Sequence, residues 1–177
     1  MRPLNADEIE VRVGQVFDQK VSMLLYKNAR VDMTILDEVY GEMNWQKDYK
    51  EIKGNLYCGV AVWDMNKEQW IWKWDCGTES NTEKEKGEAS DAFKRACVNV
   101  GGGIGRELYT SPKIYLDVAT VKDEKGRWKL HNPRELYGIF VSDIVTEEVN
   151  GKYKIKSVTL SQKVYGNAKK IGTFENK

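Results

Sequence analysis

The sequence has few of the residues from which catalytic and metal centres are usually built. It holds a single histidine, His131, and three cysteines, none of them in a Cys-x-x-Cys pair. A histidine-rich metal cluster is therefore excluded, and a Ser-His-Asp or Cys-His pair could use only His131, which precedes Pro133 in an expected loop. The sequence thus predicts no catalytic residue, no metal site and no cofactor.

Long apolar runs are also absent. No stretch approaches the roughly 20 apolar residues of a membrane span, and residues 1–14 lack the apolar centre of a signal peptide. The odd number of cysteines favours a reducing compartment. We expect a protein without a membrane partner, in the cytoplasm or on the nucleoid.

Charge of either sign is not in excess, since the formal net charge is +1. Nucleic-acid binding therefore cannot be argued from the overall charge, and it requires Lys and Arg to gather locally. The aromatic share of 11% indicates a packed core, and 177 residues suffice for one domain with a small appendage.

Two helices and a strand are expected in the first forty residues. Apolar positions predict an amphipathic helix over residues 5–18, capped by Asn5. Residues 21–26 (VSMLLY) read as a strand. A second helix is predicted over residues 32–40, capped by Asp32 or Thr34 and ended by Gly41.

A meander and a helix are predicted next. Residues 45–52, 55–64 and 69–75 alternate as strands do and are separated by short polar turns, which favours an antiparallel arrangement. A helix is predicted over residues 82–100, capped by Asn81 or Thr82. Trp70, Trp72 and Trp74 share one face of the third strand, and we expect that helix to cover them, although an aromatic stripe also suits a subunit interface or stacked bases.

From residue 111 onward the sequence is strand-rich, with turns at KDEKG and at Asn150-Gly151. The predicted fold class is α+β, with a β-β-β-α core, in which an antiparallel sheet packs on a long helix, and a strand-rich C-terminal extension. The corresponding domains are residues 1–110 and residues 111–177, the second expected to pack on the first.

The candidate binding residues are cations near the helices. Lys94 and Arg95 lie beside Phe93, on the flank of the apolar stripe, where they can meet phosphates. Asp91 lies one helical turn before them, and the ordinary alternative is a set of ion pairs on the helix surface.

Other cations suit the same role. Lys27 and Arg30 lie between a strand and a helix, where a basic residue can meet a phosphate or simply be solvated. Arg106 follows the glycines of residues 101–105, as a backbone contact or a salt-bridge partner. Those glycines come after a helix rather than before one, which is the wrong order for a phosphate-binding loop.

Three blocks in a fixed order carry a family resemblance: LLYKNARVDMTILDEVYGEMNW at residues 24–45, two strands ending in DCGTES at residues 55–80, and TEKEKGEASDAFKRACVNVGGGIGRELY at residues 82–109. They resemble the Rad52 superfamily of single-strand annealing proteins, especially the short, Sak-like members of phages and prophages. The helical Lys-Arg pair followed by glycines is the most specific element.

The resemblance implies a β-β-β-α core that assembles into rings or helical filaments, with single-stranded DNA in a positively charged groove. It places Arg30, Lys94 and Arg95 on that groove. An outer DNA site is implied on a neighbouring hairpin, where Lys67 and Lys73 are candidates. A phage exonuclease or a host single-strand-binding protein is a candidate partner, inside a bacterial host.

The resulting hypothesis is a non-enzymatic protein of homologous recombination and DNA repair that binds and anneals single strands. Two alternatives stay open: a coat protein that binds single-stranded DNA without annealing it, and a carboxylate-metal nuclease.

Overall fold

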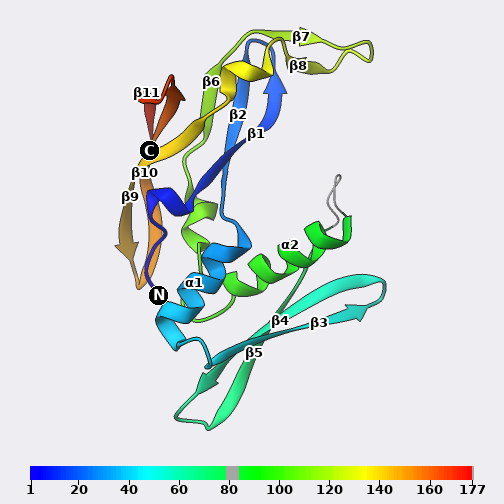
Figure 1. Ribbon diagram of the computed structural model, residues 1–177, viewed down its shortest axis with the longest axis vertical. Helices are drawn as coiled ribbons and strands as arrows, with labels where there is room; N and C mark the ends of the chain where they lie inside the picture. Colours follow the sequence, from blue (N-terminus) through cyan, green and yellow to red (C-terminus); the bar gives the residue numbers. More distant parts are fainter. Residues whose placement is uncertain (79–83, 177) are drawn as a thin grey trace. The chain divides into compact units, whose positions relative to one another are not determined.

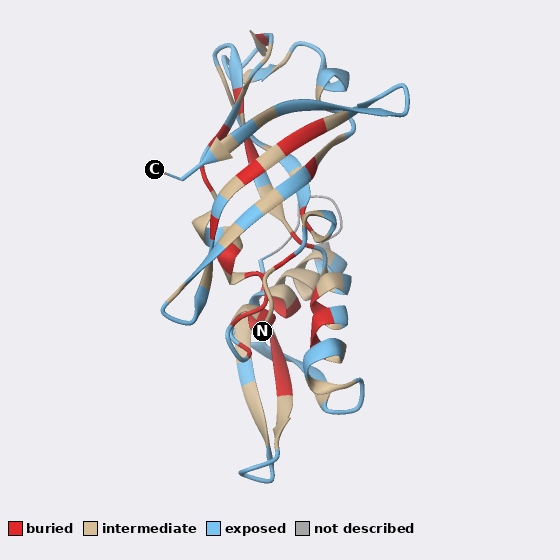
Figure 2. Ribbon diagram, turned by 90° about the vertical axis from the view of Figure 1, so that its left-hand side faces the viewer, coloured by how far each residue is buried: buried red, intermediate tan, exposed pale blue. Residues whose placement is uncertain are grey.

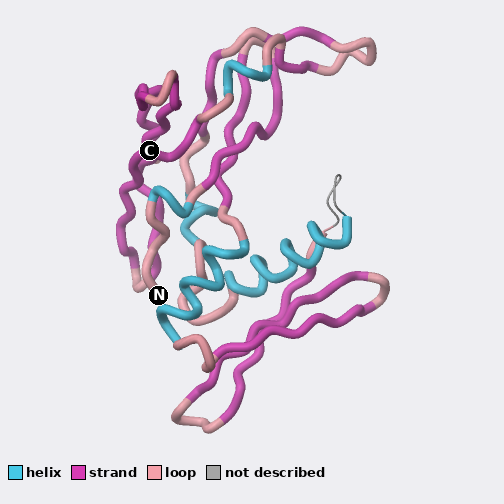
Figure 3. The backbone as a smooth tube through the Cα atoms, in the orientation of Figure 1, coloured by secondary structure: helices cyan, strands magenta, loops and turns pink. Residues whose placement is uncertain are grey.

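The computed structural model describes residues 1–78 and 84–176, and its strands and helices are drawn in Figures 1 and 3. The fold is mixed α/β, and its sheets are built from antiparallel strand pairs. The helical elements are η1 (Ala6–Glu8), α1 (Ala29–Tyr40), α2 (Lys84–Val98), η2 (Arg106–Thr110) and η3 (Pro133–Leu136). The strands are β1 (Glu10–Phe17), β2 (Lys20–Tyr26), β3 (Trp45–Ile52), β4 (Asn55–Asp64), β5 (Gln69–Cys76), β6 (Ile114–Asp117), β7 (Thr120–Lys122), β8 (Trp128–Leu130), β9 (Ile139–Val149), β10 (Lys152–Val164) and β11 (Asn167–Glu175).

The chain forms two compact units. Unit 1 joins Met1–Pro3 to Lys27–Arg106, and unit 2 joins Leu4–Tyr26 to Glu107–Lys177. The first strands belong to unit 2 because β2 pairs antiparallel with β6, from Lys20 opposite Asp117 to Met23 opposite Ile114. The functional division at residue 110 stays a prediction.

The helix expected over residues 5–18 is wrong, because that stretch forms only the short η1 and then β1. Valines at alternate positions point to one side of β1, where Val11 and Val13 pair with residues of β2. Gly14 lies close against the Leu24 side chain, since a β-carbon on this glycine would stand 2.9 Å from Leu24 Cγ. β-Branched residues and a glycine disfavour a helix, and the backbone groups of this stretch form hydrogen bonds with β2 instead.

The other early elements agree more closely with the sequence. Residues 21–26 lie within β2, and the strands expected at 45–52, 55–64 and 69–75 are confirmed as β3, β4 and β5. Helix α1 begins three residues earlier than predicted, because Asn28 rather than Asp32 or Thr34 caps it. Gly41 ends it with a φ of +86°, as a residue without a side chain readily does. The caps predicted for the second helix, Asn81 and Thr82, lie outside the described residues.

Unit 1 is built on the sheet β3-β4-β5, with β4 in the middle. Helix α2 packs against β4 and β5, and the buried positions lie on β4 and on the inner sides of both helices (red in Figure 2). They include Cys58 and Val60 on β4 and Phe93, Ala96 and Cys97 on α2.

The tryptophan stripe lies on the opposite face of this sheet. The face under α2 carries Asp75, which is opposite Cys58, while Trp74 is opposite Gly59 and therefore points the other way. The expectation that the helix covers the stripe is thus wrong. The indoles pack on one another instead, with Trp72 and Trp74 stacked at 5.4 Å between ring centroids.

Gly59 makes this aromatic packing possible. A methyl group in place of its hydrogen would stand 2.6 Å from the Trp74 ring, whose other neighbours are Trp72 and the Lys50 ammonium, 4.4 Å from the ring centroid. Gly59→Ala is therefore expected to lower the free energy of unfolding by about 1–3 kcal/mol, as measured by urea denaturation. The matched control is Gly102→Ala, where the nearest atom is 3.5 Å away, and a change within about 0.5 kcal/mol is expected. Equal effects of the two substitutions would contradict this account.

Unit 2 is mostly strand. Its largest sheet has the order β11-β10-β9, and the turn predicted at Asn150-Gly151 is confirmed between β9 and β10. Its buried residues include Val21, Val158 and Leu160. Glu107 is also buried, and its carboxylate accepts a hydrogen bond from the Leu4 backbone (2.7 Å).

Candidate nucleic-acid interface

The start of α1 places two of the candidate cations. The Asn28 side chain accepts hydrogen bonds from the backbone nitrogens of Arg30 (2.9 Å) and Val31 (3.3 Å), which fixes the first turn. Arg30 is exposed in that turn. Lys27 has the opposite environment, since only 5% of it is exposed and its ammonium is bonded to the carboxylate of Asp32.

Asp32 links the two helices electrostatically. Its burial raises the pKa of its carboxyl to about 6, and the positive charges of Lys27 and, to a lesser extent, Lys94 oppose that rise. Lys27 precedes α1 and Lys94 belongs to α2, so this carboxylate of α1 lies within reach of a cation on each side. The same negative charge adds to the effect of burial in raising the pKa of the Cys97 thiol, which makes that cysteine unreactive.

Lys94 and Arg95 leave α2 in different directions. Successive residues of a helix are about 100° apart, so the buried Phe93 fixes Lys94 on the flank and Arg95 farther out. Lys94 is half-buried, while Arg95 is exposed.

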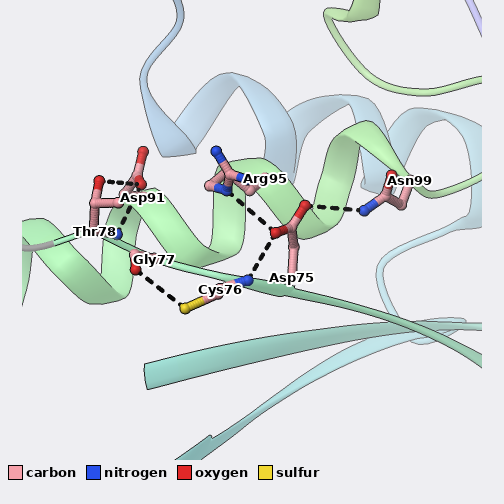
Figure 4. Close-up of polar contacts among 7 residues, drawn as sticks. All are labelled: Asp75, Cys76, Gly77, Thr78, Asp91, Arg95 and Asn99. Atoms are coloured by element: carbon pink, nitrogen blue, oxygen red, sulfur yellow. Dashed lines mark hydrogen bonds and ion pairs between the residues drawn. The ribbon is translucent and has the colours of Figure 1, made fainter. Parts of the chain in front are cut away.

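The Arg95 guanidinium is held on the β5 side of the helix (Figure 4). Its Nε donates to Asp75 Oδ1 at 3.2 Å, and Asn99 Nδ2 donates to the other oxygen at 3.2 Å. The side chains of Arg95 and Asp75 are 45% and 27% exposed. An ion pair this open to water is worth about 0–1 kcal/mol, so a phosphate group can compete with the carboxylate.

Asp91 is engaged elsewhere. Its Oδ2 accepts hydrogen bonds from the backbone nitrogen (3.1 Å) and the hydroxyl (3.0 Å) of Thr78. The Arg95 guanidinium is therefore paired with Asp75 of β5, while Asp91 fixes the chain that follows β5.

Arg106 closes the end of α2. Its guanidinium donates to the carbonyl of Val98, the last residue of the helix, at 2.7 Å. A cation at this position also faces the negative end of the helix dipole. Gly103, with a φ of +90°, lets the Arg106 side chain pass, since a β-carbon there would stand 2.6 Å from Arg106 Nε. Arg106 therefore stabilises the C-terminal end of α2.

The five candidate cations thus lie in different places within unit 1. Lys27 and Lys94 lie on either side of Asp32, and Arg30 is exposed in the first turn of α1. Arg95 lies toward β5, and Arg106 lies at the C-terminal end of α2. A phosphate-binding role for each of them stays a prediction. The burial of Lys27 favours a supporting role, since its charge is already matched by Asp32.

Sequence reasoning missed both carboxylates of this region. Asp75 could have been found from strand alternation, because it shares its face with the buried Cys58. Asp32 was expected as a helix cap and proved to be the buried partner of Lys27. The outer-site candidates differ from each other: Lys67 is paired with Asp64 at 3.8 Å, and Lys73 is exposed on β5.

Within residues 1–78 and 84–176, no three His, Cys, Asp or Glu side chains are grouped so that they could hold a metal ion. The helices of the same residues include none with the length and apolar character needed to cross a bilayer.

Fold and site together define a mixed α/β protein that carries cations on and beside two helices, one of which packs on an antiparallel sheet. The family model described as Rad52/22 family double-strand break repair protein matches residues 1–127. The chain therefore belongs to this family, and the resemblance to the Rad52 superfamily is confirmed at that level. Neither a curated protein nor a solved structure matches the chain.

Proposed function

We propose that this protein binds single-stranded DNA and anneals complementary strands in homologous recombination, as an oligomeric ring or filament. The observation that carries the proposal is the family match over residues 1–127, which includes α1, α2 and the three strands β3, β4 and β5 that lie between these helices in the sequence. The proposal extends to the short, Sak-like phage type within a bacterial host, with a phage exonuclease or a host single-strand-binding protein as the partner.

Exposed cations supply the binding step. Arg30 and Arg95 are exposed and Lys94 is half-buried, so phosphates can reach them from solvent. Each phosphate contact releases counterions, which lowers the logarithm of the binding constant by about 0.7 per tenfold rise in salt for a single strand. Three such cations give a weak site in one subunit, and repetition along an oligomer sums their contributions.

Annealing requires that bases stay free to pair. Contacts to phosphates fix the position of a strand without occupying its base edges, so a complementary strand can pair with it. The protein makes and breaks no covalent bond in this scheme. The balanced overall charge of +1 is compatible with it, because only the local cations face the strand.

The direct experiment is an annealing assay with two complementary labelled oligonucleotides at nanomolar concentration, followed by fluorescence energy transfer. The full chain is expected to accelerate pairing at least about tenfold over the spontaneous reaction at 50 mM salt, and the effect should vanish at 1 M salt because the phosphate contacts are screened.

Three results would contradict the proposal. Slower pairing with tight binding would indicate a coat protein. Shortened oligonucleotides after incubation with Mg²⁺ would indicate a nuclease. A mass measured by light scattering that corresponds to one chain, with and without DNA, would remove the oligomer on which the summed contacts depend.

A further inference from the structure

Lysines are concentrated in the C-terminal hairpin β10–β11. Residues 150–174 contain six lysines and no aspartate or glutamate, in a chain whose net charge is +1. The six are Lys152, Lys154, Lys156, Lys163, Lys169 and Lys170. This segment lies beyond residue 127, where the family match ends.

Acidic residues of the neighbouring strand lie beside the lysines at only one end of the hairpin. The neighbouring strand β9 carries Asp143, Glu147 and Glu148, and the register places Glu147 opposite Lys154. The lysines of residues 152–156 therefore lie beside carboxylates that offset their charge.

The other end has no such compensation along the sheet. Lys163, Lys169 and Lys170 are opposite Ala168, Gln162 and Ser161 on the partner strands of the hairpin. The β9 residues opposite this end, Ile139 and Phe140, are uncharged. The charged residues of the adjoining η3, Arg134 and Glu135, are one of each sign.

An exposed aromatic ring stands at the same end. Tyr165, in the turn between β10 and β11, is 100% exposed and has a φ of +49°. Tyr137 is 66% exposed, and its segment is fixed beside β10 because Gln162 Nε2 donates to the Tyr137 carbonyl (2.8 Å). We name Lys163, Tyr165, Lys169 and Lys170 the basic turn.

We propose that the basic turn is an additional contact site for single-stranded nucleic acid, in which the three lysines bind phosphates and a base stacks on Tyr165. Lysines near an exposed ring are the combination that single-strand platforms use, since every base has a face that can stack on an aromatic side chain. An acidic peptide would bind the lysines but would not account for the exposed ring of Tyr165. The inference rests on the proposed function, and it adds a site outside the cations of unit 1.

The test compares two triple variants of the full chain that lose the same charge. One carries Lys163→Gln, Lys169→Gln and Lys170→Gln, and the control carries Lys152→Gln, Lys154→Gln and Lys156→Gln. Binding of a fluorescent oligo-dT is measured by anisotropy from 50 to 300 mM salt. The basic-turn variant is expected to bind at least about tenfold more weakly at 50 mM. It should lose about 2 units of salt slope for each subunit that contacts the strand, from three contacts at about 0.7 each. The control should change affinity less than about threefold.

Stacking has its own readout. Oligonucleotides with 5-iodouracil are expected to form photo-crosslinks to Tyr165, mapped by mass spectrometry, and Tyr165→Ser should weaken binding about fivefold to tenfold while Tyr165→Phe keeps wild-type affinity. Equal losses of affinity in the two triple variants, or an unchanged affinity of the basic-turn variant, would overturn the inference. It would also be overturned if these lysines were needed for binding to anionic vesicles or to an acidic peptide but not for binding to oligo-dT.

The two proposals fail in different ways. If the unmodified chain binds no oligo-dT at low salt, the proposed function is lost together with this site. If it binds and anneals, and the basic-turn variant does so equally well, only the additional site is lost.

Discussion

Lys94→Ala combined with Arg95→Ala is expected to lower the affinity of the full chain for single-stranded DNA about 100-fold or more and to abolish annealing. Two charge-assisted hydrogen bonds are lost per subunit, each worth about 1.5–3 kcal/mol, and the loss repeats in every subunit that contacts the strand. Alanine favours a helix, Arg95 is exposed and Lys94 half-buried, and Asp32 keeps its partner Lys27, so the fold should persist. Anisotropy with oligo-dT at 100 mM salt measures the effect.

The matched control removes the same charge elsewhere. Lys125→Ala with Arg127→Ala changes an exposed turn between β7 and β8, where Arg127 pairs with Asp123 at 3.0 Å. This variant should bind within about threefold of wild type. A Lys94/Arg95 variant that binds equally well, with an unchanged oligomer mass, would show that the strand lies elsewhere.

Replacing Asp75 tests the role of Arg95 in the opposite direction, because it should raise the affinity for DNA. Asp75→Asn removes the charge that holds Arg95 and keeps an oxygen for the Cys76 backbone nitrogen, which now donates to Asp75 at 2.8 Å. Since an exposed ion pair is worth about 0.2–1 kcal/mol, DNA affinity should rise about twofold to fivefold. A lower affinity would mean that Asp75 positions Arg95 for the phosphate rather than competing with it.

Lys27→Met alone is expected to lower the free energy of unfolding by about 3–5 kcal/mol at pH 8, because it leaves the carboxylate of Asp32 buried without its partner. Lys27→Met combined with Asp32→Ala removes both charges, and the loss should shrink to about 1–2 kcal/mol. Urea denaturation measures both. If the double variant is less stable than the single one, the pair is not the source of the effect.

The same pair predicts a dependence on pH. Burial raises the pKa of Asp32 to about 6 in the folded chain, against 3.8 as its ordinary value. A carboxyl with a raised pKa holds its proton more tightly when folded, so its contribution to stability is full below about pH 4 and is lost as the pH rises through 6. The difference in pKa corresponds to about 3 kcal/mol at most. The cost of Lys27→Met should accordingly be smaller at pH 5 than at pH 8, since protonation removes the unpaired charge.

The sequence predicted the elements whose pattern is local. Strict alternation and short polar turns identified β3, β4 and β5, and Asn150-Gly151 identified a hairpin. The prediction for residues 5–18 failed because the valines of residues 11–16 fit both the helical and the strand period over so short a length. The strand also depends on a partner, β2, that lies later in the chain. Pairing of β2 with β6 depends on residues almost a hundred positions apart.

For the site, the sequence identified the cations and missed what surrounds them. Lys94 and Arg95 were found from helical spacing beside Phe93. Alternation also showed that Trp70, Trp72 and Trp74 share a face, but it does not tell which face of a sheet a helix will cover. The burial of Lys27 depends on Asp32, and ion pairing five residues apart across the start of a helix leaves no periodic signal.

The tryptophan stripe has a practical consequence. Trp63, Trp70, Trp72 and Trp74 lie on the face of the unit 1 sheet that α2 leaves uncovered, whereas Arg95 and Asp75 lie on the other face. Indole emission shifts to shorter wavelength when water is displaced from around it. Trp45 packs on Phe93 of α2 and Trp128 belongs to β8, so the emission of a variant in which both are phenylalanine reports on the arrival of a neighbour at that face. This emission needs no label and does not depend on direct contact between DNA and the cations of α2.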